Sequence, residues 1–422
     1  MHSVTNAIPT GTIASIPAKA HAHRALICAA LANSPSTILL SRTSKDIDAT
    51  MDSLRGLGAH VVYENKVVTV TPGPVPAKGN VVPHESGTTL RLLLPVAASI
   101  CNDVDVDAKG RLPDRPLEPM LGEMKAHGVT FSQDKPPFTM TGRLQGGNFS
   151  MVGDVSSQFF SGLLLAAPQI GLSTITATTP LQSSDYVTLT TETMRDFGVE
   201  VEHTLPDTNI NEAFTVPFGV SFIGRDNYQI EGDWSNAAIW MVAAGMTGKP
   251  ITITGMNKNS VQADRRIMQV MIDAGCDVVW DGMNVTVTGR ASKPIHADLE
   301  QMPDMLPVMA ALACSISGES SFVKGARLRL KESDRLIAVA NLVRDLGGTV
   351  REEGDDLYII GSGILKGGHG DCVNDHRLVM AGTLMALISE NPVTLKDSEA
   401  ITKSYPDFFE DWNLLGGDAH GI

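Results

Sequence analysis

One pattern recurs along this chain and constrains its fold more than any other feature: a glycine that follows a helical segment and precedes a run of β-branched residues. Five clear copies are spaced about 70 residues apart, and a shortened sixth copy lies near the C-terminal end. The glycines are Gly58, Gly128, Gly198, Gly275 and Gly347, with Gly416 and Gly417 in the sixth copy. Glycine after a helix is typical of a left-handed cap, and β-branched residues favour a strand. The pattern therefore predicts six repeats of one α/β unit.

A second pattern has the same period and marks the start of one helix in each repeat. Polar residues lead into segments rich in Ala, Leu and Met at residues 23–26, 88–91, 156–159, 234–237, 303–306 and 375–378. The segments that follow are apolar nearly all round, which predicts helices inside the protein. Alternation of period two at 67–71, 251–254 and 284–288 predicts strands. We expect two domains of three repeats, and parallel buried helices would direct their positive N-terminal ends toward one anion-binding face.

Length and charge agree with such a protein. A chain of 422 residues is too long for one ordinary core, and a net charge of −14 argues against a nucleic-acid surface. The five cysteines are widely spaced in apolar segments, without C-x-x-C or Cys/His ligand spacing, which favours a reducing cytosol. Residues 1–17 lack the features of a signal peptide. We expect a cytoplasmic, monomeric protein that binds no metal or other cofactor, no nucleic acid and no membrane.

The densest charge cluster is Lys331-Glu332-Ser333-Asp334-Arg335, directly before an apolar helical pattern at 336–340. If Ser333 or Asp334 caps this helix, the remaining N–H groups and the two cations form a place for an anion. The alternative is a solvated helix face, where each i,i+4 ion pair contributes about 0.3–0.5 kcal/mol.

Other polar groups precede the predicted buried helices. Lys19 and Arg24 stand at the first helix, either as ligands or as a surface pair whose stems cover apolar residues. Gly87 lies in a turn where a ligand can approach the backbone. Arg115 lies in a proline-rich loop, and Arg suits two-point recognition of carboxylate or phosphate. Either loop or turn can also be merely solvated.

Hydroxyl and carboxyl groups complete this inventory. Ser156, Ser157 and Gln158 begin a helix, where simple capping is the usual explanation. Asp304 is the one carboxylate of an apolar segment, so it is either a cap or a group whose proton affinity matters. No Ser/His/Asp set and no G-x-G-x-x-G after a strand is evident. The inventory suits group transfer between small anions, where positioning and charge stabilisation dominate.

Taken together, these motifs resemble the enolpyruvyl transferases, in their shikimate branch, over essentially the whole chain. The most specific elements are Ser156–Gln158, Lys331–Arg335, Asp375-His376-Arg377 and Lys403-Ser404-Tyr405-Pro406-Asp407. The resemblance implies an α/β (α+β) fold of two inside-out α/β barrel domains, each with three βαβαββ-type repeats around buried parallel helices. One domain would contain residues 1–18 plus 231–422 and the other residues 19–230. The active site would lie in the cleft between them.

The resemblance also implies a reaction and roles for individual residues. The family moves the carboxyvinyl group of phosphoenolpyruvate to the 5-hydroxyl of shikimate 3-phosphate, in the route to chorismate and aromatic amino acids. The shikimate 3-phosphate ligands would be Arg24, Ser156, Ser157, Gln158, Ser183 and Lys331. The phosphoenolpyruvate ligands would be Gly87, Arg115, Arg335, Arg377 and Lys403. Lys19 would contact both substrates and belong to the catalytic residues. Asp304 would take the hydroxyl proton, and Glu332 would handle the proton at the methylene carbon.

This chain departs from the family pattern in places. The first lysine of the family lies in Gly-Ser-Lys-Ser, whereas this chain has Pro17-Ala18-Lys19-Ala20, so one hydroxyl group toward the phosphate is missing. Its loss removes about 1 kcal/mol of hydrogen bonding unless water or His21 replaces it. Glu85 and Arg327 both stand where Asn is common. We expect Arg327 to bind substrate and to offset Ala20.

Two alternatives remain. The sister transferase that acts on UDP-N-acetylglucosamine shares the enol chemistry, but its reactive loop cysteine has no counterpart between Arg111 and Pro116. A non-catalytic anion-binding or scaffold protein could keep the fold. Retention of Lys19, Asp304, Glu332 and Arg335 together argues against a scaffold.

Overall fold

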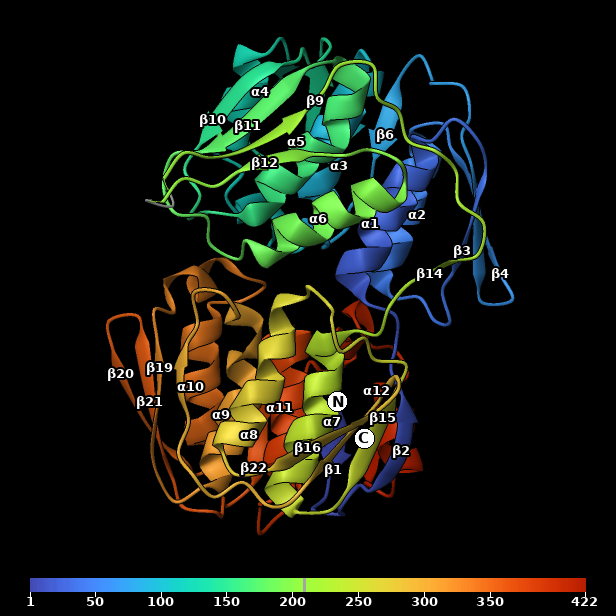
Figure 1. Cartoon of the computed structure of the whole chain (residues 1–422). Helices are drawn as coiled ribbons and strands as arrows, with labels where there is room; N and C mark the ends of the chain where they lie inside the picture. Colours follow the sequence, from blue (N-terminus) through green and yellow to red (C-terminus); the bar gives the residue numbers. More distant parts are fainter. Residues whose placement is uncertain (208–209) are drawn as a thin grey trace. The chain divides into compact units, whose positions relative to one another are not determined.

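The computed structural model describes residues 1–207 and 210–422, which form two compact units (Figure 1). Unit 1 consists of Met1–Ile16 and Glu231–Ile422, and unit 2 consists of Pro17–Ile230. Each unit has its own hydrophobic core, and the two cores share no residue. The chain therefore passes from one unit to the other twice, after Ile16 and after Ile230.

The described residues form six four-stranded sheets with one common topology: a parallel outer pair followed by two antiparallel strands. The sheets of unit 2 are β14 (Tyr228–Gln229), β3 (Ser36–Leu39), β5 (Val67–Thr71), β4 (His60–Glu64); β6 (Gly79–Val81), β7 (Asp103–Val106), β9 (Phe138–Thr141), β8 (Thr130–Phe131); and β10 (Gly147–Met151), β11 (Ser173–Ala177), β13 (Glu212–Val216), β12 (Glu202–Thr204). The sheets of unit 1 are β2 (Gly11–Ala14), β15 (Ile251–Thr254), β17 (Asn284–Thr288), β16 (Asp277–Asp281); β18 (His296–Asp298), β19 (Gly318–Val323), β21 (Asp356–Gly361), β20 (Thr349–Glu353); and β22 (Gly368–Asp371), β23 (Val393–Lys396), β1 (His2–Val4), β24 (Ala419–Gly421). The predicted sixfold repeat is thus present as six copies of one sheet.

Each repeat contributes one nearly fully buried helix. These helices are α1 (Lys19–Ala30), α3 (Gly87–Ile100) and α5 (Ser157–Ile170) in unit 2, and α7 (Trp234–Thr247), α9 (Leu306–Ser315) and α11 (His376–Ala386) in unit 1. Their all-round apolar composition explains their burial. The expected start of the first helix near His23 is wrong by one turn, because the Ala and His residues before it extend the helix back to Lys19.

Two of the six parallel strand pairs are formed across the chain rather than within one repeat. In the other four sheets a buried helix connects the parallel strands, as α3 connects β6 to β7. By contrast, β2 precedes α1 but pairs with β15, and β14 precedes α7 but pairs with β3. The two first strands have exchanged sheets, which is why unit 1 is discontinuous in sequence.

An outer helix in each repeat ends at the predicted glycine. These helices are α2 (Lys45–Gly56), α4 (Met120–Ala126), α6 (Asp185–Asp196), α8 (Ile267–Asp273), α10 (Arg335–Asp345) and α12 (Phe408–Leu414). Gly58, Gly128, Gly198, Gly275, Gly347 and Gly416 follow them with φ between 88° and 103°. This backbone conformation strains any residue with a Cβ, so the glycine pattern has a physical cause.

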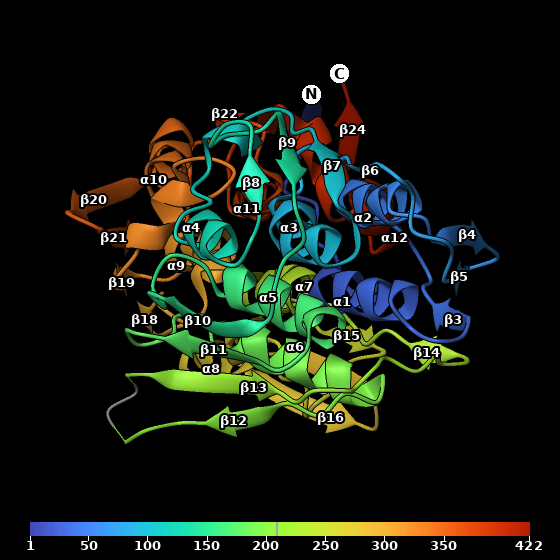
Figure 2. The same cartoon turned by 90° about the horizontal axis from the view of Figure 1, so that it is seen from above.

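Short 3₁₀ helices complete the fold: η1 (Leu112–Asp114), η2 (Ala263–Arg266), η3 (Pro303–Met305), η4 (Ala326–Leu330) and η5 (Ser398–Lys403). Helices α1, α3 and α5 lie side by side within unit 2, surrounded by its sheets (Figure 2). Across the described part of the chain, the helices are all too short or too polar to cross a membrane.

Candidate active site

Arg335 is the centre of the polar cluster in unit 1. It is the first residue of α10, and only 1% of its side chain is exposed. Its Nη1 lies 2.7 Å from Oδ1 of Asp304, its Nη2 lies 2.6 Å from Oε2 of Glu332, and its Nε lies 2.9 Å from Oδ2 of Asp375. One guanidinium group therefore holds three carboxylates, and two of these, Asp304 and Glu332, are among the three predicted catalytic residues.

The residues before α10 divide the capping and binding tasks. Asp334 caps the helix, because its Oδ1 accepts a hydrogen bond from the backbone N–H of Ile337 at 3.2 Å. Ser333 instead donates its hydroxyl to Oδ2 of Asp375 at 3.0 Å. Of the two predicted caps, Asp334 is the one that caps α10. Ser333 instead forms a hydrogen bond with Asp375, which is one of the partners of Arg335.

Charges around Asp304 fix its protonation. Lys331 Nζ lies 3.0 Å from Oδ1 of Asp304, the same oxygen that contacts Arg335. Burial alone would raise the pKa of Asp304, but Lys331, Arg335 and Arg377 hold this pKa well below its usual value. Burial lowers the pKa of Lys331 despite Asp304, whereas Asp375, Glu332 and Asp304 raise the pKa of Arg335 against the effect of burial. Without substrate, Asp304 is an ionised and weak base.

Three further predicted ligands lie at the same end of unit 1. Arg377, the second residue of α11, donates from Nη1 to the carbonyl of Ser235 at 3.0 Å. Lys403 donates to the carbonyl of Asn374 at 2.8 Å, directly before the cap of α11. Arg327 in η4 is near enough to Lys331 for its charge to lower the pKa of that lysine. The structure thus brings Arg327, Lys331, Glu332, Asp304, Arg335, Arg377 and Lys403 together.

In unit 2, two guanidinium groups face the start of α3. A Cβ added to Gly87 would lie 2.6 Å from Nη1 of Arg115 and 3.0 Å from Nη1 of Arg91. Arg91 also donates to Oε1 of Gln158 at 3.1 Å. The amide of Gln158 donates to Oγ1 of Thr88 at 2.9 Å, which joins the starts of α3 and α5.

The predicted hydroxyl ligands lie at the starts of α5 and α6. Ser156 is the cap of α5 and accepts a hydrogen bond from the N–H of Gln158 at 3.3 Å, so the capping interpretation is confirmed for this residue. Ser157 is the first residue of α5 and is buried. Ser183 is also buried and has a positive φ of 53°, two residues before α6.

Lys19 and Arg24 are anchored differently at α1. Lys19 forms an ion pair with Oδ2 of Asp46 at 2.7 Å. Arg24 is buried, donates to Oγ1 of Thr190 at 2.7 Å and to the carbonyl of Ala20 at 2.7 Å, and burial lowers its pKa to about 10. Because Ala18 offers no side-chain cap, the start of α1 has no hydroxyl group of its own.

The two histidines of this helix have structural partners. Nε2 of His21 lies 2.8 Å from the hydroxyl of Tyr228, and Nδ1 of His23 lies 2.6 Å from Oγ1 of Thr50. Burial lowers the pKa of His21 to about 4 and that of His23 well below its usual value. Both imidazoles are therefore neutral at pH 7, and a neutral His21 gives the site no extra cation.

The two units present opposite chemistry at the starts of their buried helices. In unit 2 the caps are Ala18, Ser86 and Ser156. In unit 1 the caps of α7 and α11 are Asp233 and Asp375, and Asp304 precedes α9. The starts of α3 and α5 in unit 2 thus offer hydroxyl groups and helix dipoles to an anion, whereas acids stand at the starts of the buried helices of unit 1.

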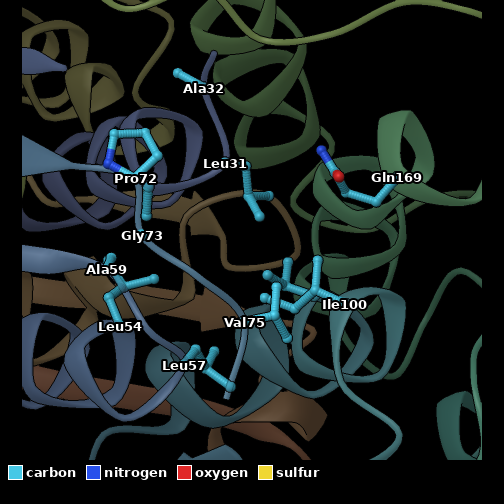
Figure 3. A pocket seen from close by; sticks show the side chains of 12 residues that line it. Leu31, Ala32, Leu54, Leu57, Ala59, Pro72, Gly73, Val75, Ile100 and Gln169 are labelled. Carbon is cyan, nitrogen blue, oxygen red and sulfur yellow. The ribbon is translucent and has the colours of Figure 1, made fainter. Parts of the chain in front are cut away.

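An apolar pocket of about 170 Å³ in unit 2 is not part of this chemistry (Figure 3). It is lined by residues near the C-terminal ends of α1, α2 and α3, such as Leu31, Leu57 and Ile100. The predicted ligands lie at the N-terminal ends of α1 and α3. No charged residue lines the pocket, so it does not suit a phosphorylated ligand.

Three residues at the site were missed by the sequence interpretation. Arg91 was visible as the fourth residue of the Thr-Thr-Leu-Arg helix start, and Asp375 as the acid of the Asp-His-Arg motif. Asp46, the partner of Lys19, has no signal beyond being an acid in the first turn of α2. Each of the three is identified as a site residue by the side chain that it contacts in the structure, and that side chain lies 27 to 67 residues away in the sequence.

Repeated α/β units whose helix starts carry Arg, Lys, Ser and paired carboxylates define an enzyme that transfers groups between small anions. The family model described as EPSP synthase (3-phosphoshikimate 1-carboxyvinyltransferase) matches residues 7–412. The 3-phosphoshikimate 1-carboxyvinyltransferase of Clostridium kluyveri is 36% identical over 413 residues, covering 97% of this chain and 95% of that protein. The enzyme of the same name from Pyrococcus abyssi is 34% identical over 405 residues, covering 95% and 94%.

Solved structures agree in fold. The EPSP synthase of Acinetobacter baumannii superposes with a TM-score of 0.81 at 23% identity, covering 100% of this chain and 99% of that one. The chain belongs to the EPSP synthase family. It is a transferase of the shikimate pathway that moves the enolpyruvyl group of phosphoenolpyruvate to shikimate 3-phosphate.

Proposed function

We propose that the polar groups of the two units together form one active site in a cleft between them, and that each unit is an inside-out α/β barrel. The observation that carries the catalytic part of this proposal is that one guanidinium, Arg335, holds both Asp304 and Glu332. The two proton-transfer roles require two carboxylates close to each other and to a cation.

In this proposal unit 2 supplies most of the shikimate 3-phosphate site. Ser157, Gln158, Ser183 and Arg24 bind the sugar-like ring and the phosphate, together with Lys331 from unit 1. Support comes from the starts of α3 and α5, which carry hydroxyl groups, and from the first turns of α1, α3 and α5, which carry no acid. Such helix starts stabilise a phosphate dianion. Ser156 contributes through its cap of α5.

Phosphoenolpyruvate is bound by cations of both units. Arg115 and the open backbone at Gly87 receive it from unit 2, and Arg335, Arg377 and Lys403 receive it from unit 1. Lys19 contacts both substrates. The carboxylate and phosphate of phosphoenolpyruvate then replace protein carboxylates as partners of Arg335. Each charge-assisted hydrogen bond of this kind contributes on the order of 1.5–3 kcal/mol.

This replacement also activates the base. When the anionic groups of phosphoenolpyruvate form ion pairs with Arg335 and Arg377, these cations no longer depress the pKa of Asp304 as strongly. The pKa of Asp304 therefore rises from its low value. Asp304 can then accept the proton of the 5-hydroxyl as the oxygen bonds to C2 of phosphoenolpyruvate. In its acid form Glu332 delivers a proton to the methylene carbon. As phosphate leaves, Glu332 takes a proton back from the resulting methyl group, and the proton held by Asp304 leaves with the phosphate. Substrate binding thereby makes a base that the free protein lacks.

The deciding experiment measures phosphate release from phosphoenolpyruvate with shikimate 3-phosphate and, in parallel, with UDP-N-acetylglucosamine. Release with the first acceptor alone supports the proposal. Release with the sugar nucleotide, or with neither, contradicts it. Small-angle scattering tests the cleft, since closure on shikimate 3-phosphate should reduce the radius of gyration, and an unchanged radius counts against a closing cleft.

The proposal includes a cytoplasmic monomer. The five cysteines are unpaired and buried, which is consistent with a reducing compartment. Light scattering at micromolar concentration tests the monomer directly.

Arg327 is proposed to bind the shikimate phosphate in place of the hydroxyl that Ala20 lacks.

A further inference from the structure

Asp264, an acid with no role in the proposed reaction, is buried beside the start of α7. It lies in η2, and only 1% of it is exposed. Ser235 donates its hydroxyl to Oδ2 of Asp264. The backbone carbonyl of the same serine accepts the hydrogen bond from Nη1 of Arg377 at 3.0 Å. Ser235 therefore connects the carboxyl group of Asp264 to a guanidinium group of the active site.

Hydrogen bonding alone does not explain an acid at this position. Oδ1 of Asp264 and Nε of Arg377 are buried, and neither has a hydrogen-bond partner among residues 1–207 and 210–422. A buried charge without full hydrogen bonding is costly. An asparagine at position 264 could accept the same hydrogen bond from Ser235 without that cost. What the aspartate adds is its charge.

The carboxyl groups of Asp264 and Asp304 interact electrostatically. Charged groups from three neighbouring elements act on the Asp264 carboxyl: Asp304 of η3, Asp233 at the cap of α7 and Arg377 of α11. The other charged residues of its own segment are Arg265 and Arg266. Burial raises the pKa of Asp264 to about 6, and the negative charge of Asp304 acts in the same direction. Because this interaction is mutual, an ionised Asp264 makes proton uptake by Asp304 more favourable.

We infer that Asp264 is a positioning residue of the transfer reaction, which holds Arg377 through Ser235 and whose negative charge makes Asp304 a stronger base. This inference rests on the proposed role of Asp304. Asp264 acts through Ser235, Arg377 and Asp304 and does not exchange a proton with the reacting atoms. Above about pH 6 it is ionised, so its effect is present at the pH at which the enzyme works in a neutral cytosol.

Two substitutions separate the charge from the link. Asp264→Asn removes the charge and keeps an acceptor for Ser235, whereas Ser235→Ala removes the link and keeps the charge. Turnover and the KM of each substrate are measured with the full chain from about pH 5 to pH 9. For Asp264→Asn we expect the acidic limb of the pH profile of kcat to move to lower pH by on the order of one unit. Turnover at neutral pH should be about three- to tenfold lower. For Ser235→Ala we expect a several-fold rise in the KM of phosphoenolpyruvate and an unmoved limb.

A merely structural Asp264 gives different results. The role of the charge is overturned if the acidic limb of the kcat–pH profile is the same in Asp264→Asn as in the parent. This comparison requires that the variant has the same circular dichroism spectrum as the parent. An unchanged KM in Ser235→Ala overturns the link to Arg377. Asp264→Glu, which restores the charge, should restore the limb. If Asp264→Asn does not fold, Asp264→Ser gives the same uncharged comparison.

A separate variant, Asp304→Ala, tests the proposed function itself. Turnover retained in Asp304→Ala overturns the role of Asp304 as the base. Loss of turnover in Asp304→Ala together with an unmoved limb in Asp264→Asn overturns only the inference about Asp264.

Discussion

The guanidinium of Arg335 and the carboxylate of Asp375 form a two-point ion pair, with Nε 2.9 Å from Oδ2 and Nη2 3.1 Å from Oδ1. Both side chains are almost completely buried, at 1% and 0% exposed. Asp375 also caps α11 through the N–H of Arg377 at 3.0 Å. One carboxylate thus sets the position of two proposed phosphoenolpyruvate ligands.

Removing this carboxylate should destabilise unit 1. We expect Asp375→Ala to lower the free energy of unfolding by about 3–5 kcal/mol, because it leaves a buried guanidinium without its main partner. The four tryptophans, Trp234, Trp240, Trp280 and Trp412, all lie in unit 1, so their fluorescence in a urea titration reports on it. The control is Glu352→Ala, which breaks the partly exposed pair with Arg344 at the other end of α10 and should cost below about 1 kcal/mol. Equal effects of the two variants would contradict the prediction.

The two carboxylates held by Arg335 should control turnover more than binding. We expect Glu332→Gln and Asp304→Ala each to lower kcat by more than about tenfold, because each removes one proton transfer. Their KM values should change modestly. Steady-state kinetics with both substrates decide the matter, and a residue whose replacement leaves kcat unchanged has no proton-transfer role.

Space at Gly87 should determine phosphoenolpyruvate binding. A methyl group there would lie 2.6 Å from Nη1 of Arg115, so Gly87→Ala must displace that guanidinium. We expect the KM of phosphoenolpyruvate to rise by about tenfold, equivalent to about 1.4 kcal/mol, with little change for shikimate 3-phosphate. Gly421→Ala is the matched control, because nothing lies within 4 Å of an added Cβ at that position. A similar KM in both variants would refute the role of this space.

The missing hydroxyl at position 20 can be restored. Ala20→Ser should lower the KM of shikimate 3-phosphate about fivefold if one hydrogen bond contributes about 1 kcal/mol. Ala30→Ser, at the other end of α1, is the control and should leave this KM unchanged. If Ala20→Ser also has no effect, other groups, such as Arg327, already satisfy the phosphate.

The raised pKa of Asp264 makes stability depend on pH. Its pKa is about 6 in the folded protein and 3.8 ordinarily, so the folded state holds a proton that the unfolded chain has lost between these values. The stabilising contribution is complete below about pH 3.8 and is lost as the pH rises through about 6. Thermal unfolding of Asp264→Asn and the parent across this window should therefore favour the variant increasingly with pH. A constant difference would mean that Asp264 titrates normally.

Local sequence determined much of this protein. The glycines after the outer helices must adopt positive φ, and apolar segments of helical length must be buried, so the sixfold repeat and the six inner helices follow from short stretches of sequence. Polar residues at the starts of these helices had to serve as caps or ligands, which is why so many candidate residues were visible. The start of α1 was misplaced because alanine and histidine continue a helix without marking its beginning.

Tertiary structure decided which of these groups meet. No local signal indicates that β2 pairs with β15 and β14 with β3, because strands of equal propensity differ only in the packing around them. Arg335 and Asp375 are 40 residues apart, and their ion pair exists because two repeats place their helix starts side by side. The ionised state of Asp304 and the raised pKa of Asp264 arise from burial and neighbouring charges, which depend on distances in space and not on order in the chain.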